Sequence, residues 1–183
     1  MGVDVKVIPK SRIWGVDLLI FVTLGTQCQD FSRLIKFVEI GINKGKIREK
    51  VIVQAGQTEY ESELVEIRSY IPKDEQDQLY KDCSLLITHG GVGSITGALK
   101  FGKKVIAVAR LKSLNEHINN HQLEIIDKFV KDGYILSAND EKTFIKALSE
   151  IDKFKPRVYK SNTHNMIQLL KEYIVAQEKE SKL

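Results

Sequence analysis

The residues best suited to chemistry form a glycine-rich turn. Residues 88–95 read Thr-His-Gly-Gly-Val-Gly-Ser-Ile and follow an apolar run typical of a buried strand. Glycines let a ligand approach the backbone closely, and a helix that begins here directs unpaired amides and a partial positive charge at that ligand. A tight turn without a ligand is the alternative interpretation. The residues that we expect to bind a phosphate group in this glycine turn are Gly90, Gly91, Gly93 and Ser94.

A second polar segment, residues 115–122, reads Asn-Glu-His-Ile-Asn-Asn-His-Gln and precedes an amphipathic stretch. Amide and imidazole groups can both donate and accept hydrogen bonds, which suits the recognition of sugar hydroxyls. A cluster that caps the following helix is the alternative interpretation. The residues that we expect to contact a sugar are Asn119, Asn120, His121 and Gln122.

Two further loops end apolar runs in the same way. Gly25 and Thr26 follow the run at 17–23, and Gly56 follows the run at 51–55. Each signal is weak alone. Because ligands of open parallel sheets bind at the carboxyl ends of the strands, we expect both loops to meet the glycine turn at one edge.

The elements that must position these residues alternate along the chain. We expect strands over 17–23, 51–55, 64–71, 84–88, 104–109 and 134–136. We expect helices from a cap at Asp30 to Gly45, and over 73–81, 94–101, 119–131, 140–151 and 162–177. This alternation predicts an α/β fold with a doubly wound, mostly parallel six-stranded sheet of the Rossmann-like type.

The composition suits one globular domain. The 183 residues are 43% hydrophobic and 28% charged, which excludes a disordered chain, a disulfide scaffold and a collagen-like fibre. Cys28 and Cys83 lack any metal-ligand spacing, so we expect two reduced thiols, and no apolar run is long enough to span a bilayer. We expect an extension over 1–16, either poorly ordered or an amphipathic contact, a domain over 17–177 and a charged tail over 178–183.

The net charge of +4 hides basic blocks at 100–112 and 153–171, which contain no acid. Each block is either a solvated face or a contact with a phosphate, a nucleotide or an acidic lipid surface. The blocks lack interleaved aromatic residues and any nucleic-acid-binding motif. No nucleic acid partner is therefore expected.

Five segments, in order, resemble the C-terminal domain of family 28 glycosyltransferases. They are residues 21–26, 53–56, 88–95, 103–110 and 116–122. The resemblance covers about residues 18–173. It extends to small stand-alone members, namely the catalytic subunit of the eukaryotic dolichol-linked N-acetylglucosamine transferase and bacterial capsule or exopolysaccharide galactosyltransferase subunits.

The resemblance implies the donor-binding half of a type B glycosyltransferase. By likeness, the glycine turn would hold the diphosphate of a UDP-sugar, and Asn120, His121 and Gln122 would contact the donor sugar with Glu116 nearby. Thr26 would line the cleft that faces a partner. Several family members carry an acidic residue that can bind ribose a few positions into the helix, where this chain has Gly97.

The activity so implied is an inverting, metal-independent transfer of galactose or N-acetylglucosamine from a UDP-sugar to a lipid-diphosphate-linked acceptor in capsule or exopolysaccharide synthesis. The helix amides would stabilise the leaving diphosphate, and neither a metal nor a cofactor is expected. The attacking hydroxyl needs a base, which lies either in this chain or on a partner. The candidates in this chain are His89, Glu116 and His117.

A chain of 183 residues is short for both walls of a cleft between two domains. We therefore expect a membrane-anchored partner subunit that supplies the acceptor-binding half and holds the chain at the cytoplasmic face of the membrane. A non-catalytic nucleotide-sugar-binding or scaffolding subunit is the alternative. A nucleotide-sugar epimerase of related fold is a further alternative, but such chains are about twice as long.

Overall fold

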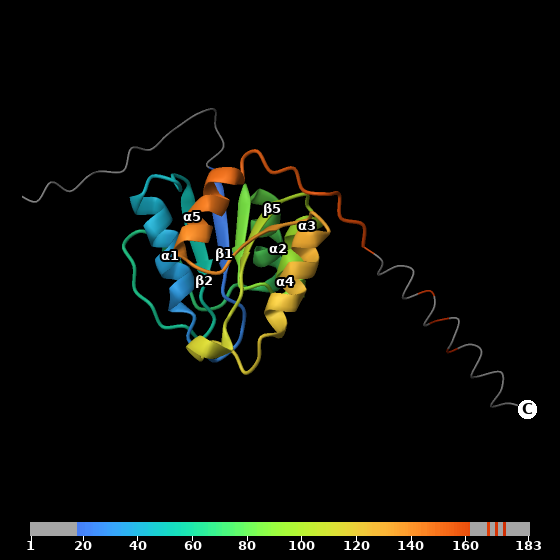
Figure 1. Ribbon diagram of the computed structural model, residues 1–183, viewed down its shortest axis with the longest axis horizontal. Helices are drawn as coiled ribbons and strands as arrows, with labels where there is room; N and C mark the ends of the chain where they lie inside the picture. Colours follow the sequence, from blue (N-terminus) through green and yellow to red (C-terminus); the bar gives the residue numbers. More distant parts are fainter. Residues whose placement is uncertain (1–17, 162–167, 169–170, 172–173, 175–183) are drawn as a thin grey trace, which may run out of the picture.

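The computed structural model describes residues 18–161 together with Gln168, Lys171 and Ile174 (Figure 1). The predicted extension at 1–16, most of the helix predicted over 162–177 and the tail at 178–183 lie outside the described residues.

Six parallel strands form one sheet in the order β3-β2-β1-β4-β5-β6. The strands are β1 (Leu19–Thr23), β2 (Lys50–Gln54), β3 (Glu66–Arg68), β4 (Leu85–Thr88), β5 (Lys104–Val108) and β6 (Leu136–Ala138). The strand order reverses between β1 and β4, which is where open α/β sheets bind ligands. The predicted doubly wound α/β fold is confirmed.

Helices cover both faces of the sheet (Figure 1). They are α1 (Ser32–Asn43), α2 (Lys73–Asp82), α3 (Val92–Leu99), α4 (His121–Lys131) and α5 (Glu141–Glu150), with a 3-10 turn η1 (Lys112–Leu114) after β5. Helices α1 and α5 pack on one face of the sheet, and α2, α3 and α4 pack on the other, so that each face has its own apolar core. The central strands are buried on both faces, which explains their continuous apolar sequence.

Several element boundaries differ from the sequence prediction, and three of the differences concern β3, β6 and α3. Strand β3 spans only Glu66–Arg68, because this edge strand pairs with β2 alone. Strand β6 begins two residues later than expected, because the Tyr134 amide bonds to the Phe129 carbonyl at the end of α4. Helix α3 begins at Val92 with Gly91 as its N-cap, so Ser94 lies inside the first turn and does not cap the helix.

The predicted helix caps differ in outcome. Asp140 caps α5 in a capping box with Thr143, as expected. Asp30 lies one residue before the N-cap of α1, and its carboxylate instead accepts the amide and the hydroxyl of Ser32.

Cys28 is exposed, Cys83 is buried, and both are free thiols. Within the described residues, no helix has the length and the apolar character needed to cross a membrane.

Candidate functional site

The loops that the sequence singled out meet at the carboxyl edge of the sheet, the lower edge in Figure 1. The His89 imidazole lies between Gly25 of the loop after β1 and Gly91 of the glycine turn, so that a side chain on either glycine would overlap the ring. Gly56, after β2, packs equally closely against the Gly25 carbonyl. The loops after β1, β2 and β4 therefore form one packed unit.

The amino end of α3 points into open space within this unit. The first backbone bond of the helix joins the Ile95 amide to the Gly91 carbonyl at 3.0 Å, so the amides of Val92, Gly93 and Ser94 have no partner inside the helix. Apart from its two neighbours in sequence and the nearby backbone of its own helix, no atom of the described chain lies within 4 Å of the position that a Cβ on Gly93 would take. The helix thus presents free donors and a positive dipole end to an unfilled volume.

His89 is neutral at physiological pH. Burial lowers its pKa to about 4, and the positive charges of Arg110 and His117 act in the same direction. Nδ1 lies 3.2 Å from the Thr23 carbonyl oxygen, which can only accept, so Nδ1 carries the proton and Nε2 keeps its lone pair. Such a weakly basic imidazole is poorly suited to remove a proton from a hydroxyl.

The polar segment 115–122 uses its side-chain amide oxygens to hold its own backbone and the backbone of residues 110–112. The Asn119 oxygen accepts the His121 amide at 3.1 Å, and the Asn120 oxygen accepts the Lys112 amide at 3.1 Å. The Gln122 oxygen accepts the Arg110 amide at 3.0 Å. The capping interpretation is therefore partly correct, and the amide nitrogens of these side chains are the groups left to donate to a ligand.

The two histidines of the polar segment are held differently. His117 is half-buried, close enough to His89 to act on its pKa, and its Nδ1 contacts the Asn119 backbone. His121 is exposed at the first position of α4, and its Nδ1 lies 3.1 Å from the Glu124 carboxylate. Both are brought to the same edge as the glycine turn.

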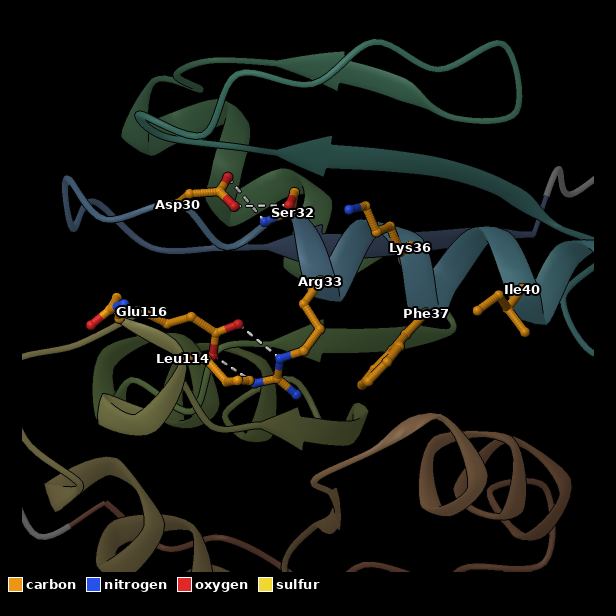
Figure 2. Close-up of a pocket in the computed structure, with 9 residues that line it drawn as sticks. Asp30, Ser32, Arg33, Lys36, Phe37, Ile40, Leu114 and Glu116 are labelled. Atoms are coloured by element: carbon orange, nitrogen blue, oxygen red, sulfur yellow. Dashed lines mark hydrogen bonds and ion pairs between the residues drawn. The ribbon is translucent and has the colours of Figure 1, made fainter.

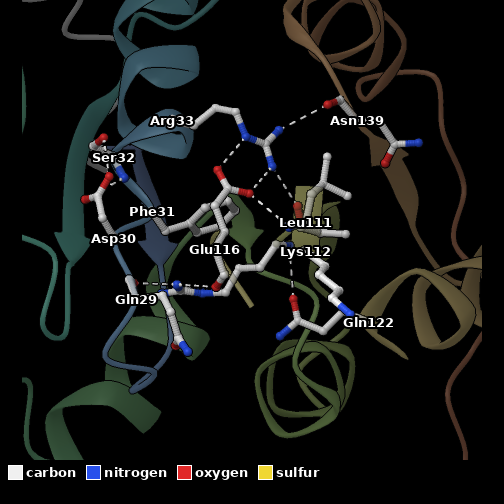
Figure 3. Close-up of polar contacts among 12 residues, drawn as sticks. Gln29, Asp30, Phe31, Ser32, Arg33, Leu111, Lys112, Glu116, Gln122 and Asn139 are labelled. Carbon is white, nitrogen blue, oxygen red and sulfur yellow. Dashed lines mark hydrogen bonds and ion pairs between the residues drawn. The ribbon is translucent and has the colours of Figure 1, made fainter. Parts of the chain in front are cut away.

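Glu116 does not have the free carboxylate that a base needs. One oxygen accepts from Arg33 Nε at 2.8 Å, and the other accepts from Arg33 Nη2 at 2.7 Å and from the Leu111 amide at 2.9 Å (Figure 3). Its side chain is 6% exposed. Glu116 therefore supports the loop after β5, and its predicted catalytic role stays a prediction.

Arg33 and Arg110, whose positions the sequence did not predict, also support the loop after β5. Arg33, on α1, also donates to the carbonyls of Ala109 and Asn139. Arg110 is fully buried and donates to the carbonyls of Leu24, Gln29 and Glu116. In the sequence Arg110 ends an apolar run, lies in the basic block at 100–112 and closes the resembling segment 103–110.

The space beside Gly97 is occupied by an aromatic ring. A Cβ on Gly97 would lie 2.9 Å from Tyr80 Cε2, and the Tyr80 ring is itself buried against Phe21 at a centroid distance of 5.5 Å. The position at which several family members carry an acidic residue is therefore packed against a tyrosine from α2.

A pocket of about 440 Å³ lies beside this edge, between α1 and the loop after β5 (Figure 2). Phe37, Ile40 and Leu114 contribute apolar surface, and Arg33 and Lys36 contribute charge. Of the predicted site residues only Glu116 lines it. The pocket is therefore a neighbour of the glycine turn and does not contain it.

The basic block at 100–112 is divided by the fold. Lys100, Lys103 and Lys104 precede or begin β5, at the edge opposite the glycine turn, and Lys104 binds the carbonyls of Ile151 and Asp152. Arg110 and Lys112 follow β5 at the carboxyl edge. The three lysines therefore cannot contact a phosphate bound at the glycine turn.

Known proteins resemble this chain in sequence and in fold. The human UDP-N-acetylglucosamine transferase subunit ALG13 is 30% identical over 125 residues, which are 63% of this chain and 10% of that protein. The solution NMR structure of ALG13 has a TM-score of 0.54 at 21% identity, covering 85% of this chain and 95% of that chain. The calicheamicin glycosyltransferase CalG4 has a TM-score of 0.56 at 14% identity, covering 75% of this chain and 35% of that chain.

A family match that extends over most of the chain shows to which family the chain belongs. Residues 19–178 match the family described as the glycosyltransferase family 28 C-terminal domain. The two solved structures share the fold of this chain, and their identities of 14% and 21% carry the likeness no further than the fold. The chain therefore belongs to the glycosyltransferase family 28 C-terminal domain family.

Proposed function

We propose that this chain is the donor-binding catalytic subunit of an inverting glycosyltransferase that takes a hexose, galactose or N-acetylglucosamine, from a UDP-sugar. The acceptor would be a lipid-diphosphate-linked sugar in capsule or exopolysaccharide synthesis. The observation that carries the proposal is Gly93, which lies in the first turn of α3 with nothing of the described chain near its Cβ position.

Within the described residues, neither backbone conformation nor packing explains the glycine at this position. Its φ is not positive, and packing leaves room for a larger residue. A glycine inside a helix is destabilising by roughly 0.5–1 kcal/mol relative to alanine. A ligand that lies against the backbone of the first turn supplies the missing reason, and the free amides there suit a diphosphate.

The proposed reaction is a single displacement. The acceptor hydroxyl attacks the anomeric carbon from the face opposite the diphosphate, the bond between that carbon and the diphosphate oxygen breaks, and its electron pair stays on the departing UDP. The amides and dipole of α3 stabilise the negative charge that develops on this group, without a metal ion. The amide nitrogens of Asn120 and Gln122 would donate to the sugar.

The proton of the attacking hydroxyl goes to a base on the partner subunit in this proposal. Both Glu116 oxygens are occupied, and the pKa of His89 is low because the ring is buried. His117 is the remaining candidate in this chain. The engaged oxygens of Glu116 and the lowered pKa of His89 favour a base from outside the chain.

The human relative is a UDP-N-acetylglucosamine transferase subunit, which supports a partner for this chain as well. We propose that a membrane-anchored partner binds the lipid-linked acceptor above the carboxyl edge. The partner would hold this chain at the cytoplasmic face of the membrane.

The deciding experiment measures sugar transfer. Membranes that contain the lipid-linked acceptor are incubated with radiolabelled UDP-galactose or UDP-N-acetylglucosamine and this chain, with and without the co-expressed partner. We expect transfer of one of the two sugars only when both proteins are present, and none with Gly93→Ala. Transfer by the chain alone would contradict the need for a partner. UDP-sugar binding without transfer in the complete system would instead indicate a non-catalytic binding subunit.

A further inference from the structure

Arg110 is a charged side chain that the core encloses completely. It has no exposed surface, and the face of its guanidinium lies over the Phe31 ring with Cζ 4.7 Å from the ring centroid. Nη2 donates to the Leu24 carbonyl at 2.8 Å, and Nη1 donates to the carbonyls of Gln29 at 2.7 Å and Glu116 at 3.2 Å. The guanidinium of Arg110 thus contacts both ends of the loop at 24–29, which contains Gly25, and connects this loop to the polar segment 115–122.

The positive charge of Arg110 has no direct counter-ion. Its hydrogen-bond acceptors are backbone carbonyls, and Nε has no partner in the described part of the chain. The carboxylate of Glu116 is oriented toward Arg33, and Asp30 is exposed and bonded to Ser32. Burying a cation in this way is costly unless an anion compensates it.

The charge of Arg110 acts on the glycine turn. Leu24, whose carbonyl it binds, adjoins Gly25, and Gly25 packs on His89 beside Gly91. The positive charge of Arg110 also contributes to the lowered pKa of His89. An anion bound at the amino end of α3 would therefore lie in the field of Arg110 without touching it.

We infer that Arg110 is a positioning residue of the anion site, which fixes the loop at 24–29 against the polar segment and whose buried charge favours a diphosphate at the glycine turn. This inference rests on the proposed donor site. Burial lowers the pKa of Arg110, whereas Glu116, Asp30 and Cys28 act to raise it. His89 and His117 are further titratable groups at this edge of the sheet.

The test uses pyrophosphate and UDP as probes in calorimetric titrations of the full chain. Arg110→Gln removes the charge, and Arg110→Lys keeps it with fewer hydrogen bonds. Lys100→Gln is the matched control, because it removes one exposed charge at the opposite edge. We expect Arg110→Gln to bind pyrophosphate about tenfold more weakly, and Arg110→Lys to stay within about threefold of the unmodified chain. The control should be unchanged.

A second readout separates the field of Arg110 from a general loss of structure. NMR titration of the His89 imidazole should show its pKa rising toward the usual value in Arg110→Gln and staying low in Arg110→Lys. A folded Arg110→Gln that binds pyrophosphate as tightly as the unmodified chain would overturn the inference. If the unmodified chain binds neither pyrophosphate nor UDP, the proposed function fails. In that case an unchanged His89 titration in Arg110→Gln would separately reject the inference about Arg110.

If Arg110→Gln does not fold, the variant Asp30→Asn tests whether the charge of Arg110 favours anion binding. Asparagine keeps the size and bonding of an exposed side chain while removing a negative charge that acts on Arg110. Pyrophosphate should then bind about twofold more tightly. Unchanged or weaker binding would count against the field of Arg110.

Discussion

Arg33 and Glu116 form a two-bond ion pair that joins α1 to the loop after β5, with Nε–Oε1 at 2.8 Å and Nη2–Oε2 at 2.7 Å. The same carboxylate accepts the Leu111 amide. The guanidinium of Arg33 lies 5.3 Å from the Phe31 ring centroid, and the opposing Arg110 lies 4.7 Å from it. This pair therefore holds the first turn of α1 against the loop that leads to the polar segment.

Glu116→Gln should lower the free energy of unfolding by about 3 kcal/mol, because it leaves the largely buried Arg33 without its counter-ion. Urea denaturation at neutral pH measures this. Lys44→Gln is the control, since its pair with Glu141 is half-exposed on both sides and should contribute less than about 1 kcal/mol. A Glu116→Gln variant with full stability and no transfer activity would show that Glu116 acts as a base after all.

Two glycines of α3 should respond to alanine in opposite ways. Gly93→Ala should keep or raise stability, by up to about 1 kcal/mol, because its Cβ position is open and alanine favours helix. The same change should weaken UDP binding at least about tenfold, because the methyl group occupies the volume in front of the free amides. Thermal unfolding and calorimetry measure the two effects.

Gly97→Ala is the matched change in the same helix. It should reduce stability by about 1–3 kcal/mol, because its Cβ would press on the Tyr80 ring that Phe21 holds in place. UDP binding should stay within about threefold of the unmodified chain. If Gly93→Ala bound UDP normally, the amino end of α3 would not be the diphosphate site.

His89 should make stability depend on pH below neutrality. Its pKa in the folded chain is about 4, against an ordinary value of 6.5, because the ring is buried. The unfolded chain therefore binds more protons between these values, and the contribution of the neutral ring is complete above pH 6.5 and lost as the pH falls toward 4. Between pH 7 and pH 5 we expect a loss of roughly 2 kcal/mol from this residue.

Urea denaturation across this pH range tests the His89 prediction. His89→Gln should remove that part of the pH dependence, whatever its effect on absolute stability. His121→Gln, which changes an exposed imidazole, should leave the dependence intact. An identical pH dependence in His89→Gln and the unmodified chain would show that another group titrates.

The sequence by itself determined the parallel α/β fold and the edge at which the loops meet. Continuous apolar runs alternating with amphipathic segments leave few other arrangements, and strand ends of a parallel sheet share one edge. Gly25, Gly56 and Gly91 were recognisable because each follows a strand. The start of α3 was misplaced because the backbone dihedrals of Gly91 and Val92, and not their side chains, decide where helical bonding begins.

Tertiary structure alone decided which polar side chains remain free. Glu116 and Arg33 are 83 positions apart, and Arg110 and Leu24 are 86 positions apart. No spacing rule along the chain connects such residues. Because a polar group that is buried must find a partner, the fold decides that the Glu116 carboxylate bonds to Arg33 and that the Arg110 guanidinium is enclosed.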